Sequence, residues 1–112
     1  MLFRSFPFVG DVRGVGYMWG LEFVADPTTG APPDPALDVT AQAVAAAADS
    51  GLIVYPARCC IDGTRGDAFI VGPPLTATDE ELAELLTRLR ATLTSLGALF
   101  PKLNPSCPQH LR

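Results

Sequence analysis

An arginine in a polar loop is the residue of this sequence best placed to do chemistry. Arg65 lies in ARCCIDGTRGD, between the apolar runs GLIVYP and DAFIVGPP. A guanidinium on a loop that two strands support can reach into a cleft, and its planar pair of donors suits a carboxylate. The spacing leaves an alternative open, in which Arg65 is exposed to solvent or pairs with Asp62 or Asp67.

The other reactive side chains form no catalytic or metal-binding pattern. Cys59, Cys60 and Cys107 are odd in number, and the adjacent pair does not easily close a disulfide. His110, the only histidine, lies in the Pro-rich C-terminal stretch. We therefore interpret the cysteines as reduced thiols, and we expect no catalytic triad, no cofactor-binding residue and no metal site in this chain.

Composition restricts the class of protein. The chain has 112 residues, of which 48% are hydrophobic and 18% charged, and its net charge is −4. This length fits one globular domain, and the negative charge disfavours a nucleic-acid partner. No run approaches the ~20 apolar residues of a membrane span, and none resembles a signal peptide. We therefore expect no membrane association and a cytoplasmic location.

The glycines of the first half favour a strand over a nucleotide site. In GVGYMWGLEFVA the aromatic residues and Leu21 occupy every second position, which is strand periodicity, and the pattern is open to a hairpin that begins near Val9. Gly14, Gly16 and Gly20 follow G-x-G-x-x-x-G, one residue longer than the dinucleotide fingerprint. We assign Gly14 and Gly16 to a turn or bulge.

A loop and a helix follow. DPTTGAPPDPALD is rich in turn-forming residues, and either Asp34 or Asp38 caps the helix in VTAQAVAAAADSG, which ends near Gly51. This helix has an alanine face that we expect to pack closely on the sheet. The face consists of Ala41, Ala45 and Ala48.

The second half predicts two buried strands, within GLIVYP and DAFIVGPP, and a long helix. Thr78 and Glu81 have the spacing of a capping box. A stripe of leucines follows at helical spacing: Leu82, Leu85, Leu86, Leu89, Leu93 and Leu96. The whole order predicts an α+β fold, a small and mostly antiparallel sheet with helices packed on one face.

Several stretches in register resemble a known family. VGDVRGVGYMWGLEFVAD, GLIVYP, DGTRGDAFIVGPPLTATDEEL and the closing helix are similar to the C-terminal small domain of class III aminotransferases, which depend on pyridoxal phosphate (PLP). The resemblance covers roughly residues 7–97. It implies that residues 1–100 form this small domain, and we expect 101–112 to be a disordered Pro-rich tail.

The resemblance also implies a function and partners. Members of the family are homodimers that transfer an amino group between an amine or amino acid and a keto acid. Their large domain holds PLP through a lysine, and the small domain closes over the substrate. Arg65 falls in the loop where many members have the arginine that binds the substrate carboxylate. Arg13 also matches a family position, with a structural role expected there.

Departures from the family pattern limit what the chain can do. The only lysine, Lys102, matches no cofactor lysine, so we expect the chain by itself to be inactive as a transaminase. Cys59 and Cys60 stand where relatives commonly have glycines, and Ala68 stands where many have histidine. Two alternatives stay open: a non-catalytic remnant that binds a partner subunit, and an unrelated module that binds a small ligand.

Overall fold

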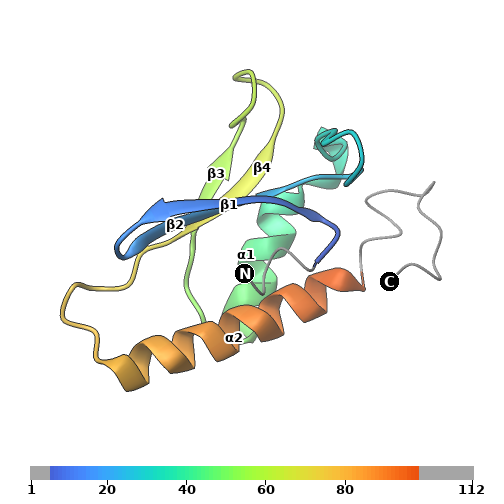
Figure 1. The fold of residues 1–112 in the computed structure, drawn as a ribbon. Coiled ribbons are helices and arrows are strands. Elements are labelled where there is room, and N and C mark those ends of the chain that lie inside the picture. Colours follow the sequence, from blue (N-terminus) through green and yellow to red (C-terminus); the bar gives the residue numbers. More distant parts are fainter. Residues whose placement is uncertain (1–5, 99–112) are drawn as a thin grey trace.

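The computed structural model describes residues 6–98, which form a four-stranded sheet and two helices (Figure 1). The strands are β1 (Val9–Val15), β2 (Met18–Phe23), β3 (Tyr55–Arg58) and β4 (Asp67–Val71). A 3-10 helix, η2 (Pro35–Leu37), precedes α1 (Val39–Asp49), and α2 (Asp79–Gly97) follows β4. The predicted α+β class is confirmed.

The sheet joins two hairpins through their inner strands. Its order is β1-β2-β4-β3, and every neighbouring pair is antiparallel. β1 and β2 form one hairpin and β3 and β4 the other, while Leu21 of β2 lies opposite Phe69 of β4. The hairpin that the sequence pattern left as a possibility is therefore present, and it begins at Val9.

The core lies between one face of the sheet and the two helices. Phe23 and Phe69 are fully buried, and their rings meet edge to face with centroids 5.3 Å apart. Edge-to-face contact is a favoured geometry of aromatic pairs and adds to the effect of burial. The helices contribute mainly small and aliphatic side chains to this core: Val39, Ala43 and Ala47 from α1, and Leu89, Leu93 and Leu96 from α2.

The alanine face of α1 is not the predicted one. Ala43 and Ala47 are fully buried, whereas Ala41, Ala45 and Ala48 are exposed. Six of the eleven residues of this helix are alanine and they occur on every side of it, so alanine spacing alone does not say which side packs. Val39, which is buried beside Ala43, marks the correct side because a β-branched residue gains more from burial than alanine does.

Both candidate caps before α1 are used. The Asp34 carboxylate accepts a hydrogen bond from the Ala36 amide at the start of η2, and the Asp38 carboxylate accepts one from the Ala41 amide in the first turn of α1. At α2 the Thr78 and Glu81 side chains bond reciprocally to each other's backbone amides, which confirms the capping box.

The predicted strand in GLIVYP begins later than expected. β3 starts at Tyr55, and the Leu52 amide instead donates to Ala47 O and closes the end of α1. Gly51, with φ +82°, makes this closure possible. Leu52 and Val54 are buried, whereas Ile53 between them is 95% exposed.

The two glycines assigned to a turn or bulge have different roles. Gly16 has φ +59° and forms the two-residue turn between β1 and β2 with Tyr17. Gly14 is required by close packing, because a Cβ there would lie 2.7 Å from the Cα of Trp19. The bulge itself occurs at Gly10, between Val9 and Asp11.

Several expectations concern residues outside the described range. The tail at 101–112, with Lys102, Cys107 and His110, is among them. Within residues 6–98 no helix is both long enough and apolar enough to cross a bilayer.

Candidate functional site

The loop between β3 and β4, residues 59–66, holds Arg65 through Asp62. One carboxylate oxygen of Asp62, Oδ1, accepts hydrogen bonds from the Thr64 amide (3.0 Å), the Thr64 hydroxyl (2.8 Å) and the Arg65 amide (2.8 Å). The other oxygen, Oδ2, accepts from Nε of Arg65 at 2.9 Å. Of the two aspartates considered for Arg65, Asp62 is thus the one that pairs with it.

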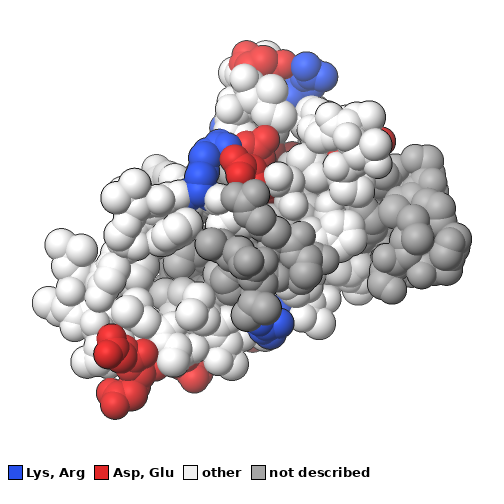
Figure 2. All heavy atoms as spheres, in the orientation of Figure 1, with Lys and Arg blue, Asp and Glu red and all other residues white. Residues whose placement is uncertain are grey.

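These contacts set the charge of the loop. The bonds from Thr64, followed by those from Arg65, hold the pKa of the Asp62 carboxyl well below its usual range. The Arg65 side chain is 56% exposed. Its bond to Asp62 uses Nε, and the two Nη nitrogens carry its other four N–H groups. The charged end of the hairpin is visible at the top of Figure 2.

The backbone of the loop is closed by its own hydrogen bonds. The Cys59 amide donates to Gly66 O (2.9 Å) and the Ile61 amide to Arg65 O (3.0 Å). Gly66 has φ +113°, and a Cβ there would lie 2.7 Å from Sγ of Cys60. Only glycine therefore fits this position without strain. Cys59 is also in the left-handed region, with φ +58°.

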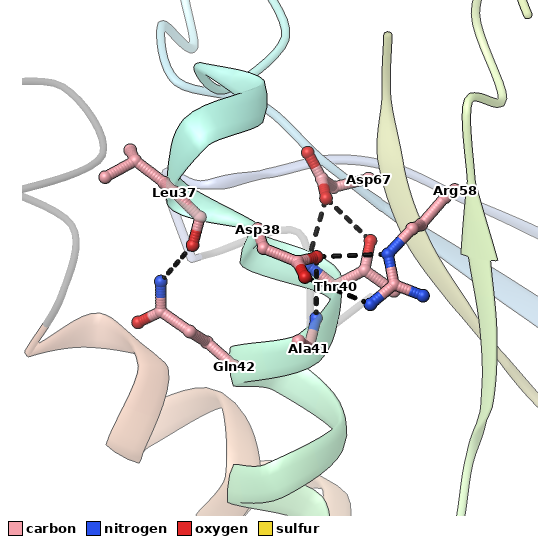
Figure 3. A network of polar contacts seen from close by, with 7 residues as sticks. All are labelled: Leu37, Asp38, Thr40, Ala41, Gln42, Arg58 and Asp67. Carbon is pink, nitrogen blue, oxygen red and sulfur yellow. Dashed lines mark hydrogen bonds and ion pairs between the residues drawn. The ribbon is translucent and has the colours of Figure 1, made fainter. Parts of the chain in front are cut away.

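The base of the same hairpin is fixed to the start of α1 (Figure 3). Asp67 Oδ1 accepts hydrogen bonds from the Thr40 amide (2.9 Å) and the Thr40 hydroxyl (2.6 Å). Arg58 donates from Nε and Nη2 to the Asp38 carboxylate at 3.0 and 3.2 Å. The bond to Arg58 lowers the pKa of Asp38 and raises that of Arg58.

The sheet face opposite the helices forms an open hollow of about 760 Å³. Its walls include Val15 and Met18, which are 86% and 67% exposed. Arg13 lies along it, with Nη1 2.6 Å from Asp11 and Nη2 3.1 Å from Glu22. These bonds raise the pKa of Arg13, the one from Asp11 contributing most.

Cys60 borders this hollow. Desolvation raises the pKa of its thiol above the ordinary value, and the nearby Glu22 carboxylate acts in the same direction. A raised pKa keeps the thiol protonated and unreactive near neutral pH. No cluster of metal-ligating side chains occurs within the described part of the chain.

A second, apolar cleft of about 330 Å³ lies between α2 and the β1–β2 hairpin. The first-half leucines of α2, among them Leu82, Leu85 and Leu86, line it together with Trp19. The indole N–H of Trp19 donates to Gly16 O at 2.6 Å, so its polar edge is satisfied inside the hairpin. At this end of α2 the leucine stripe lines the cleft, whereas further along the helix it is buried in the core. Helical periodicity alone does not distinguish these two parts of the stripe.

The contact between Asp67 and Thr40 was not predicted from the sequence. The one signal for it is a threonine among the apolar positions of the α1 pattern, since Thr40 is fully buried beside Val39. A buried hydroxyl needs a hydrogen-bond partner. The identity of that partner depends on tertiary structure.

Most of the chain is similar in sequence to proteins named as aminotransferases. A protein of Schizosaccharomyces pombe named as an uncharacterized aminotransferase is 41% identical over 99 residues, 88% of this chain and 22% of the relative. The aminotransferase YodT of Bacillus subtilis is 41% identical over 88 residues, 79% of this chain and 20% of the relative. The homologues of this chain are aminotransferases. No family model matches it.

Solved structures give the same result. A PLP-bound aminotransferase mutant from Vibrio fluvialis has a TM-score of 0.75 and 29% identity, covering 87% of this chain and 20% of that one. An omega-aminotransferase from Paracoccus denitrificans has a TM-score of 0.72, also at 29% identity, and covers the same shares of each chain. The chain therefore spans about a fifth of the length of the aminotransferases that it matches.

Proposed function

We propose that this chain is the C-terminal small domain of a class III aminotransferase, over residues 1–100. In the complete enzyme, a homodimer, it takes part in PLP-dependent transfer of an amino group between an amine or amino acid and a keto acid. One observation carries the proposal: similarity to aminotransferases extends from 77% to 88% of this chain while covering about a fifth of each relative.

The described residues, 6–98, include no lysine that could hold the cofactor covalently. The one lysine in the sequence, Lys102, lies outside the described residues. We therefore assign PLP to the large domain of the complete enzyme.

Arg65 is the proposed binding group for the substrate carboxylate. Asp62 accepts from Nε and thereby fixes the plane of the guanidinium. The edge formed by the two Nη nitrogens has the two parallel donors that a carboxylate takes in bidentate pairing. The negative charge of Asp62 offsets part of the attraction, so selectivity at this site comes from hydrogen-bond geometry as well as charge.

A second candidate function is a non-catalytic remnant that binds the large domain or a whole subunit of an aminotransferase. The hollow on the sheet face without helices favours it. Val15 and Met18 are largely exposed there, and a Cβ at Gly20 on its floor would make only ordinary contacts, at 3.9 Å or more, with backbone oxygens. Such an apolar surface is typical of interaction sites.

Fusion to a partner separates the two functions. The sequence, joined to the N-terminal four-fifths of YodT in place of that enzyme's last fifth, should give a protein that absorbs near ~420 nm with PLP and transaminates. The chain alone should show no such band. A fusion that folds and binds PLP without transaminating would support the remnant instead. A borohydride-trappable band in the chain alone would contradict both.

A further inference from the structure

The two strands that carry the Arg65 loop are fastened to α1 at one level of the hairpin. Arg58, the last residue of β3, and Asp67, the first of β4, are cross-strand partners. Asp67 bonds to Thr40 and Arg58 to Asp38, so both contacts reach the first turn of the same helix (Figure 3). The loop begins directly beyond them.

The two contacts differ in strength. Asp67 is 6% exposed and Thr40 is fully buried, so loss of the Asp67 acceptor leaves the buried Thr40 amide and hydroxyl without it, and loss of the Thr40 hydroxyl removes one of the two bonds to Asp67 Oδ1. The Arg58 and Asp38 side chains are each 51% exposed, and solvent screens a pair of this kind. The bond between Asp67 and Thr40 is therefore the principal fastening.

The hairpin depends on this fastening because of its place in the sheet. β3 is an edge strand of four residues, and among the strands of residues 6–98 it pairs with β4 alone. Gly66 joins Asp67 to the loop and accepts the Cys59 amide hydrogen bond that closes it. Because Gly66 alone separates Asp67 from Arg65, a change of backbone direction at Asp67 also changes the position of Arg65.

We propose that Asp67 and Thr40 are positioning residues for Arg65: their buried hydrogen bonds fix the direction in which the hairpin presents the guanidinium. The inference rests on the proposed function of Arg65 in carboxylate binding. Bidentate pairing requires alignment of two donors with two acceptors, and a misplacement of about 1 Å can cost on the order of 100-fold in rate.

The backbone dynamics of the 112-residue chain test the fastening directly. Thr40→Val removes the hydroxyl and keeps the shape of the side chain. We expect the NMR order parameters of the Thr64 and Arg65 amides to fall from about 0.85 to about 0.6 or below. Asp67→Asn, a second variant that keeps an acceptor oxygen and loses the charge, should lower them less.

Matched controls separate positioning from loss of stability. Thr92 is also fully buried, and its hydroxyl donates to Arg88 O within α2 at 2.8 Å. Thr92→Val should leave the loop order parameters unchanged, and Thr40→Ser should restore them. Unchanged order parameters in Thr40→Val and Asp67→Asn, or the same fall in Thr92→Val, would overturn the proposal.

Kinetics of the fusion with YodT distinguish this inference from the function on which it rests. Thr40→Val should raise KM for an amino acid donor at least several-fold and leave KM for a simple amine nearly unchanged. If Thr40→Val loosens the loop but changes neither KM, the fastening of the hairpin by Asp67 and Thr40 stands and the carboxylate role of Arg65 is refuted. An ordered loop would refute the fastening whatever the kinetics.

Discussion

The two hairpins of the sheet end in opposite ways. β1 and β2 are joined by two residues, Gly16 and Tyr17, with one side-chain bond from Trp19 across the turn. β3 and β4 are joined by residues 59–66, in which the Asp62 carboxylate accepts four hydrogen bonds. Pairing two strands requires only the first kind of connection. The longer connection holds a polar loop in one conformation, which is expected of a loop that binds a ligand.

Backbone geometry shows the same contrast. The short turn has one left-handed residue, Gly16, which has open space around it. The long loop has three, Cys59, Gly63 and Gly66, and the last is packed against Cys60. A non-glycine residue in this region costs free energy of order 1 kcal/mol or more and persists where surrounding bonds hold it. The loop conformation is therefore maintained by its contacts.

The largest effect is expected where the hairpins meet. Phe69 on β4 is fully buried and contacts Phe23 on β2. Phe69→Ala should lower the free energy of unfolding by about 3–5 kcal/mol, measured by urea denaturation, and loosen both hairpins. Ile70→Ala, on the opposite and partly exposed face of the same strand, is the control and should cost clearly less. Equal losses would contradict a core on one face only.

Alanine at the two turn glycines compares the hairpins directly. Gly66→Ala combines φ +113° with contact to Cys60, and it should cost about 3 kcal/mol of folding free energy. Gly16→Ala has φ +59° and no neighbour within 4 Å, so about 1 kcal/mol is expected. Thermal unfolding of both variants measures the difference. A smaller loss at Gly66 than at Gly16 would show that the long loop is not held as described.

The smallest effect on stability is expected when the pH is lowered and Asp62 becomes protonated. Because the pKa of Asp62 is lowered in the folded state, its contribution to stability is fully present above the unfolded pKa of about 3.9, declines below it and is gone once pH has fallen through the lower folded value, where the folded carboxyl itself is protonated. The amide signals of Thr64 and Arg65 should therefore stay unchanged by NMR down to about pH 3. Asp62→Asn, which has no carboxyl to titrate, is the control. A midpoint near pH 4 in the unmodified chain would contradict these bonds.

Local patterns in the sequence predicted the elements that depend on neighbours along the chain. The capping box of Thr78 and Glu81 involves residues three apart, and the alternation from Tyr17 to Phe23 sets which side of β2 is buried. Both follow from backbone geometry alone. The pairing of Arg65 with Asp62 was also within reach as one of two alternatives, because an aspartate three residues earlier can cap its amide.

Contacts between distant residues were not predictable in this way. Thr40 and Asp67 are 27 positions apart and meet only because α1 packs beside β4. Leu82 and Leu93 belong to one helical stripe, yet the first lines a cleft and the second is fully buried. How deeply each leucine is buried depends on how far the sheet extends along α2. Tertiary packing therefore sets the burial, while the helical periodicity is the same for both residues.

The central claim is that the Arg65 loop contributes a carboxylate site to an aminotransferase. The direct measurement is kcat/KM of the fusion with YodT for an amino acid donor and for a simple amine, in Arg65→Ala and in Arg90→Ala, an exposed arginine of α2. We expect Arg65→Ala to lower the amino acid value at least about tenfold, the loss of about 1.4 kcal/mol of binding, with the amine value and both Arg90→Ala values nearly unchanged. Equal losses for both donors, or none for either, would contradict the claim.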